Sequence, residues 1–314
     1  MIRLIALLVM AIGYALLNGP PSARTQWTEG APEAWARLDL SAFENPADGF
    51  MCPMDRDVVS KTQGYCPRCR MKLMKVETSA RADSPEYPVV ASSEPAALQA
   101  GAPAALRFRV ENPETHTAVN DFELVHEKFY HLFLVSEDLS FFLHTHPEPQ
   151  PDASLRLRVT LPKTGMYRVL SDFYPKGGTP QLVSNTLFVG NNSAAQTTPH
   201  LSEDLSVQRA ENLTASLTAE PARPVAHAKT QLYLRWEPND GMEPYLGAMG
   251  HMLVASADLV DMMHSHPLQT TDGYKYKQLQ FQVMFPRAGM YRVWIQSQRK
   301  GVVNTVAFNI AVAE

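Results

Sequence analysis

Seven of the chain's ten histidines fall into two groups that could bind a metal ion. The first group contains His126, His131, His144 and His146, and the second contains His251, His264 and His266. Residues two apart in a β-strand share a face, so each H-x-H pair presents two imidazoles together. Neutral imidazole is a good ligand for copper, zinc, nickel and ferrous ions. We therefore expect a metal site in the first group and a weaker or softer one in the second.

The residues between the histidines predict how each group comes together. His131 is expected to open a strand, and a turn at 138–140 could return the chain beside it. Four methionines give the second group softer surroundings that would favour Cu(I): Met249, Met252, Met262 and Met263. The alternative is that the histidines bond to the backbone and the methionines fill a core. The other three histidines, His116, His200 and His227, fall in loops or linkers and receive no role.

The three cysteines lie close together and form a second candidate metal site. Cys52 precedes Pro53 and Met54, and the knuckle Cys66-x-x-Cys69 is followed by Met71. A C-x-x-C turn directs two thiolates at one ion. Thiolate with thioether favours Cu(I) or Zn(II) over hard cations. We expect one bound ion here. The alternative is a disulfide between Cys66 and Cys69, with Cys52 outside any disulfide.

This cysteine segment resembles the small heavy-metal-binding domain of copper-transporting P-type ATPases and of adaptor subunits in copper and silver efflux pumps. The shared pattern is C-P-M followed by C-P-x-C-x-M, and it covers about 27 residues at positions 49–76. The resemblance implies a metal bound by Cys52, Met54, Cys66, Cys69 and Met71. The family usually has His where this chain has Asp55, and Gly where it has Arg70.

The elements that must position the histidines are strands of a duplicated domain. Apolar and polar residues alternate at 106–110, 155–161, 232–236, 279–285 and 306–310, which is the period of β-strands. His131 matches His251 at a spacing of 120 residues, and His144-x-His146-Pro matches His264-x-His266-Pro at the same spacing. A repeat of this length is a duplicated domain, and short strands with turns predict an all-β sandwich.

Each repeat also contains the step Gly-Met-Tyr-Arg-Val, at Gly165 and at Gly289. Its tyrosine is typical of the tyrosine corner in immunoglobulin-like sandwiches, where the phenol bonds to backbone upstream. Along most of their length the repeats resemble exported bacterial YtkA-like and FixH-like domains, through Val-His-Glu-Lys-x-x-His and His-x-His-Pro. This resemblance implies an immunoglobulin-type fold. Members often carry His near the last strand, where this chain has Asn304.

The domain organisation follows from these patterns and from the first residues. Arg3 precedes an uncharged apolar run at 4–17, which has the length of a signal-peptide core and is short for a membrane span. A buried N-terminal helix is the alternative. We predict a signal peptide or anchor at 1–24, linkers at 25–48, 77–97 and 191–211, a metal-binding hairpin at 49–76, and sandwiches at 98–190 and 212–314.

Composition excludes some classes of function. The net charge of −4 does not suggest nucleic acid as a partner, and the N-terminal segment is the only expected membrane contact. No nucleophile elbow or phosphate loop is present, so we do not expect an enzyme. We expect a periplasmic or secreted protein that binds copper or zinc for buffering, sensing or delivery. An envelope module that docks on a metal-efflux protein is the alternative, and a His-ligated metalloenzyme a further one.

Overall fold

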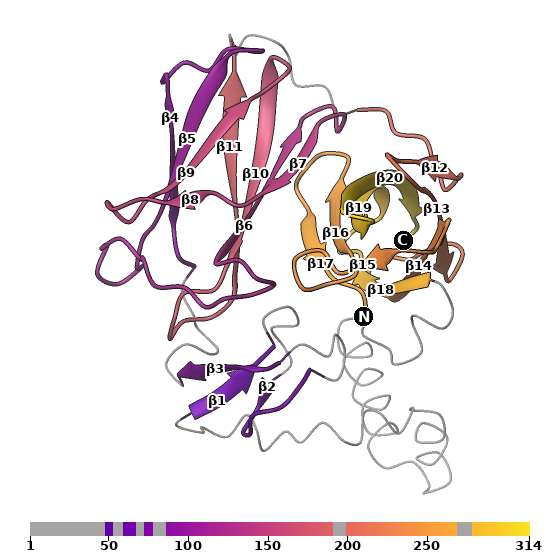
Figure 1. The fold of residues 1–314 in the computed structure, drawn as a ribbon, viewed down its shortest axis with the longest axis horizontal. Coiled ribbons are helices and arrows are strands. Elements are labelled where there is room, and N and C mark those ends of the chain that lie inside the picture. Colours follow the sequence, from indigo (N-terminus) through magenta and orange to yellow (C-terminus); the bar gives the residue numbers. More distant parts are fainter. Residues whose placement is uncertain (1–47, 53–58, 67–71, 78–85, 191–198, 269–277) are drawn as a thin grey trace, which may run out of the picture. The chain divides into compact units, whose positions relative to one another are not determined.

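A computed structural model describes residues 48–52, 59–66, 72–77, 86–190, 199–268 and 278–314 (Figure 1). These residues form twenty β-strands and contain no helix, so the all-β prediction is confirmed. None of them therefore belongs to a helix long and apolar enough to cross a membrane. The predicted signal or anchor at 1–24 lies outside the described residues.

The first repeat is an immunoglobulin-like sandwich of two four-stranded sheets. One sheet has the order β4-β5-β9-β8 and the other β11-β10-β6-β7. The strands are β4 (Val89–Glu94), β5 (Pro103–Val110), β6 (Tyr130–Ser136), β7 (Phe142–Thr145), β8 (Glu148–Pro149), β9 (Leu155–Thr160), β10 (Gly165–Phe173) and β11 (Gln181–Val189). The predicted alternation holds in β5, where Leu106 and Phe108 are fully buried in the core between the sheets.

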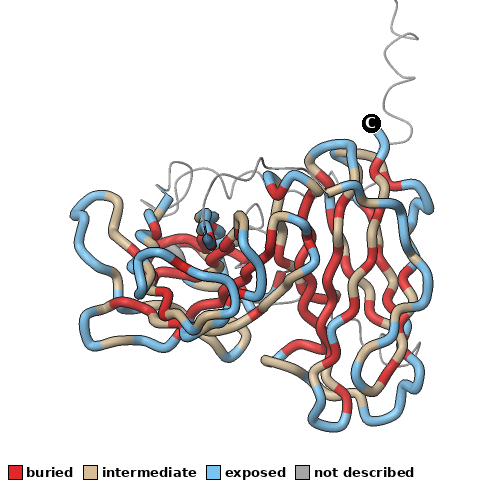
Figure 2. Tube along the Cα trace, turned by 90° about the horizontal axis from the view of Figure 1, so that it is seen from above, coloured by how far each residue is buried: buried red, intermediate tan, exposed pale blue. Residues whose placement is uncertain are grey.

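The second repeat has the same arrangement, in the sheets β12-β13-β14-β18 and β15-β19-β16-β17, with β20 paired to β19. Its strands are β12 (Gln208–Arg209), β13 (Thr214–Glu220), β14 (Lys229–Glu237), β15 (Met242–Glu243), β16 (His251–Ser256), β17 (Met262–Ser265), β18 (Gln278–Met284), β19 (Gly289–Arg299) and β20 (Val302–Val312). Leu232 and Leu234 of β14 are fully buried, as the sequence alternation predicts. Figure 2 shows the buried residues gathered in the strands and the exposed ones in the connecting loops.

Both tyrosine corners form as predicted. The Tyr167 hydroxyl donates to the carbonyl of Lys163 at 3.0 Å and accepts from its backbone N–H at 3.0 Å. Tyr291 makes the equivalent pair of bonds to Arg287, at 2.9 and 3.3 Å. In each repeat the phenol therefore fixes the turn that immediately precedes its own strand, β10 or β19.

The two repeats pack against each other through the sheets that contain β6 and β16. Every residue of both strands is buried, so both faces of each strand are covered. Leu132 and Leu134 face the core of their own sandwich, whereas Phe133 and Val135 belong to a separate cluster. That cluster, here called the interface cluster, consists of Phe133, Val135, Leu139, Leu170, Leu253, Ala255, Leu259 and Trp294. It joins residues of both repeats.

The cysteine segment forms a small antiparallel sheet with the order β2-β1-β3. Its strands are β1 (Asp48–Met51), β2 (Val59–Ser60) and β3 (Met74–Glu77). The sheet contacts the first sandwich, because Met51 packs with Tyr174 and the Tyr174 hydroxyl donates to the carbonyl of Lys75 at 3.3 Å.

Candidate metal centre

The β6–β7 hairpin brings the first histidine trio together. His131 is the second residue of β6, His144 lies in β7 opposite Phe133, and His146 follows β7. The predicted turn forms at 138–140, where the Asp138 carboxylate accepts hydrogen bonds from the backbone and side chain of Ser140. In the second repeat, β16 and β17 place His251, His264 and His266 in the same way.

In both repeats the ring nitrogens converge on a small volume. Nδ1 of His131 lies 3.1 Å from Nε2 of His144 and 3.2 Å from Nε2 of His146. In the second repeat Nδ1 of His251 lies 2.9 Å from Nε2 of His266. Each trio offers three ligand nitrogens that lie within 4.8 Å of one another. The structure thus assembles both predicted trios, and their role as ligands stays a prediction.

Backbone carbonyls fix the protonation of the first histidine in each trio. Nε2 of His131 lies 3.0 Å from the carbonyl oxygen of Val125, and Nε2 of His251 lies 2.8 Å from that of Tyr245. A carbonyl only accepts, so Nε2 must carry the proton in both rings. A neutral imidazole has one N–H, and Nδ1 of each ring is therefore an unprotonated nitrogen that faces the other histidines.

Side chains from the opposite repeat fix the second histidine. Nδ1 of His264 donates to the carboxylate of Asp172 at 2.6 Å, and Nδ1 of His144 lies 2.9 Å from Oε1 of Gln296. The Gln296 amide presents its oxygen to His144 and its nitrogen to Thr305, and with this orientation Nδ1 of His144 is the donor. Nε2 of His144 and of His264 are therefore also unprotonated. Each bond crosses from one sandwich to the other.

This arrangement of ring nitrogens would be energetically unfavourable if the histidines served only as packing residues. Nδ1 of His131 and Nε2 of His144 are both unprotonated and lie 3.1 Å apart, so two lone pairs face each other. Nε2 of His264 and Nδ1 of His266 are buried with no hydrogen-bond partner among the described residues. Buried polar nitrogens without a partner are costly. A cation shared by each trio would satisfy these nitrogens, so the donor set fits a transition-metal ion.

Burial keeps the imidazoles in the neutral form that metals require. Desolvation lowers the pKa of His264 and His266 well below the usual value of 6.5, and the neighbouring histidines lower it further. Burial likewise lowers the pKa of His146 to about 3, and it lowers that of His144. Ligand histidines must be deprotonated, so these rings need no proton loss at neutral pH to bind a metal.

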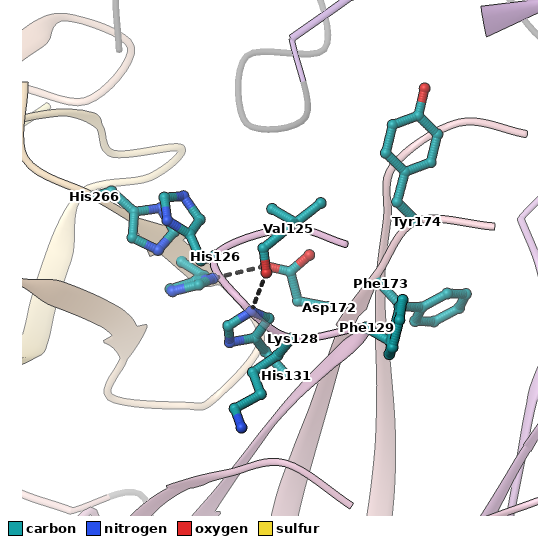
Figure 3. Close-up of a pocket in the computed structure, with 10 residues that line it drawn as sticks. Val125, His126, Lys128, Phe129, His131, Asp172, Phe173, Tyr174 and His266 are labelled. Atoms are coloured by element: carbon teal, nitrogen blue, oxygen red, sulfur yellow. Dashed lines mark hydrogen bonds and ion pairs between the residues drawn. The ribbon is translucent and has the colours of Figure 1, made fainter. Parts of the chain in front are cut away.

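His126 was expected to assist the first trio, but the structure places it against the second. Its ring lies against His266 (Figure 3), with the ring centres 3.7 Å apart. It also meets His251 edge-on at 5.8 Å. A hydrogen bond to the backbone of Leu246, its counterpart in the second repeat, holds it there. His126 and Leu246 both have a positive φ, so the two loops share this backbone conformation although their side chains differ. The repeats are therefore not interchangeable.

The softer setting expected from the methionines does not form. Met249, Met252 and Met263 pack in the core of the second sandwich. Strand alternation explains this, because Met252 and Met263 are neighbours of His251 and His264 and therefore face the other side of the sheet. Met262 packs against the interface cluster. Asn304, which occupies the position near the last strand where YtkA-like and FixH-like domains often carry His, donates a hydrogen bond to Asn212 and has a structural role.

The cysteine segment is described only in part. Cys52 and Cys66 are both fully buried and lie in one cluster with Leu73. This places two of the three predicted thiol ligands together, and thiolate ligation stays a prediction. Met54, Cys69 and Met71 lie outside the described residues.

Comparison with known families supports the duplication. The model of a domain of unknown function, DUF8832, matches residues 82–190 and again residues 197–314. The chain belongs to this family. The resemblances to YtkA-like or FixH-like domains and to the heavy-metal-binding domain remain predictions. No curated protein matches the sequence.

Among solved structures, the chain is similar to an adhesin and to a fibronectin type III segment. One is FdeC, an adhesin of Escherichia coli, with 14% identity, a TM-score of 0.26 and coverage of 77% of this chain and 69% of the other. Another is a two-domain fibronectin type III segment of chicken tenascin, with 8% identity, a TM-score of 0.21 and coverage of 72% and 98%.

Two residues of the candidate site, Asp172 and Gln296, could not be identified from the sequence. They occupy equivalent positions in β10 and β19, where they pair with His131 and His251 across the sheet. Each bonds to a histidine of the opposite repeat, so no pattern within one repeat indicates the contact. The only signal is the 124-residue spacing that relates them, as it relates the two Gly-Met-Tyr steps.

We expect Asp172 to support the second trio although it belongs to the first repeat. In a His144→Ala variant only the second trio remains complete. Adding Asp172→Ala to this variant should weaken metal binding about 10–100-fold, because it removes the outer-shell partner of His264. With His264→Ala present instead, Asp172→Ala should have no effect. Chelator competition measures both pairs. Equal effects in the two backgrounds would contradict the crossed arrangement.

Proposed function

We propose that the protein is an exported binder of transition metals, with copper favoured, that buffers or delivers the ion. The observation that carries this proposal is the pair of unprotonated nitrogens on His131 and His144, 3.1 Å apart in a buried site. The rings donate hydrogen bonds to the carbonyl oxygen of Val125 and to the amide oxygen of Gln296, which hold them in this state. Oriented imidazoles with fixed second-shell partners are what a metal site needs.

Copper is favoured over zinc on two grounds. Nitrogen sites bind Cu²⁺ more tightly than the other divalent ions of the first transition row. The cysteine segment adds thiols, which suit Cu(I), and buries Cys52 and Cys66 side by side in one cluster. A chain with both ligand types can hold copper in either oxidation state. Zinc remains the alternative ion.

Contacts between the cysteine sheet and the first sandwich support delivery rather than storage alone. Met51 and Met74 pack with Val125 and Tyr174 of the first repeat. Val125 is also the residue whose carbonyl fixes His131. The thiol-bearing sheet thus lies against the loop that leads to the histidines, so an ion released from it would meet this loop first.

Titration of the metal-stripped full chain with copper against a chelator tests the proposal. A matched variant with Cys52, Cys66 and Cys69 replaced by Ser isolates the histidine sites. We expect this variant to keep saturable, tight copper binding, and the unmodified chain to bind one further Cu(I) ion. If the variant binds copper no better than a variant that also lacks all seven clustered histidines, the histidines are packing residues.

Export is expected because the apolar run at 4–17 has the length of a signal-peptide core. A reporter fused after Ala97 should be active only outside the cytoplasm. Activity confined to the cytoplasm would refute export without bearing on metal binding.

A further inference from the structure

We propose that the two histidine trios form one dinuclear metal centre at the interface between the sandwiches. The inference rests on the proposed function and goes beyond it, because two ions in adjacent shells behave differently from two ions in separate domains. The trios could have faced away from each other, as they would if each belonged to an independent domain. The structure brings them into contact.

Imidazoles of different trios lie nearly as close together as imidazoles of the same trio. Within the trios the distance between ring centres runs from 4.5 Å for His264 and His266 to 5.9 Å for His251 and His264. Between the trios, His144 lies 5.4 Å from His251 and 5.9 Å from His264, and His131 lies 5.7 Å from His264. An ion sits about 2 Å from its nitrogens. Two bound ions would therefore have adjacent coordination shells, separated only by the histidine rings.

The crossed hydrogen bonds make each shell depend on the opposite repeat. Gln296 of the second repeat holds His144 of the first, and Asp172 of the first holds His264 of the second. The second histidine of each trio, His144 or His264, is therefore fixed only when the sandwiches are packed. The interface cluster supplies that packing, with Phe133 stacked on His144 at 4.3 Å between ring centres.

The two trios differ in the hydrogen-bond acceptor of their second histidine, and this difference determines which trio binds the first ion. His264 donates to a carboxylate, whereas His144 donates to a neutral amide. A carboxylate partner makes an imidazole a stronger ligand. The first ion should therefore enter the second trio, which the sequence had suggested to be the weaker one.

The centre keeps limited access to solvent. A cavity of about 10 Å³, enough for roughly one water, lies beside His126, His131, Asp172, His264 and His266. Three imidazoles would leave one position open on a four-coordinate ion. Each ion would therefore retain one position for a water molecule or another small ligand.

Electron paramagnetic resonance of the full chain loaded with Cu²⁺ tests the proposal. The variant without Cys52, Cys66 and Cys69 is used, because thiols would reduce the ion. At one equivalent we expect the spectrum of an isolated Cu²⁺. At two equivalents we expect intensity lost to spin pairing, or a half-field transition, rather than twice the first spectrum. His144→Ala should bind one ion fewer and give only the isolated spectrum.

The outcomes separate this inference from the proposed function. Two ions with simply additive spectra, or saturation at one ion, would overturn the dinuclear centre and leave metal binding intact. No bound Cu²⁺ would overturn both. The copper titration of the chain that keeps all its histidines decides the question by itself. The conclusion therefore does not depend on whether the His144→Ala variant folds.

Discussion

Replacing His144 by alanine should reduce the copper bound at the histidines from two ions to one. His144 supplies one of three converging nitrogens in the first trio and also contacts the second trio. Removal of a ligand should cost more than the roughly 10–100-fold that loss of an outer-shell partner costs. Chelator competition on the cysteine-free chain measures this change directly.

His116→Asn is the matched control for this experiment. His116 is an exposed loop residue with a positive φ, which asparagine tolerates better than alanine. We expect it to bind two ions with unchanged affinity. Circular dichroism of each variant checks that the sandwiches remain folded. Equal binding by His144→Ala and His116→Asn would remove His144 from the metal site.

Acid should destabilise the metal-free protein steeply below about pH 6.5, the unperturbed histidine value. Burial lowers the pKa of His264 and His266 in the folded state, so the unfolded chain takes up protons that the folded chain excludes. The free energy of unfolding therefore falls as pH drops through this range. Each proton that only the unfolded chain takes up lowers the free energy of unfolding by about 1.4 kcal/mol per pH unit.

Urea unfolding of the metal-stripped chain at several pH values measures this slope. His266→Leu should reduce it by about one proton, whereas replacement of the exposed His200 by Asn should leave it almost unchanged. A solvent-exposed imidazole ligand would lose its metal as pH drops through about 6.5, where it takes up a proton. Because the folded rings stay neutral below that value, metal binding should persist until the protein unfolds. A stability that is flat between pH 7 and 5 would contradict this view.

Much of the site could be predicted from the sequence because the relevant forces are local. Alternation in the strands fixes which residues face the same side, and the turn at 138–140 fixes the β6–β7 hairpin. These two features suffice to place His131 beside His144 and His146. The 120-residue spacing then transfers the whole arrangement to the second repeat.

The interface between the repeats could not be read from these patterns. It depends on contacts between residues more than 90 positions apart, such as His264 with Asp172. One signal was present, because residues 130–135 are apolar apart from His131, without the polar alternation of a strand that faces water. Such a run predicts burial on both faces. It does not identify the covering surface, and for that reason His126 was assigned to the wrong trio.

The most direct test of the central claim is anomalous X-ray scattering at the copper edge from crystals of the copper-loaded, cysteine-free chain. We predict two peaks, one about 2 Å from the converging nitrogens of His131, His144 and His146, and one equally placed among His251, His264 and His266. Copper found only at other surfaces, or no ordered copper at the interface between the sandwiches, would contradict a metal centre built from these histidines.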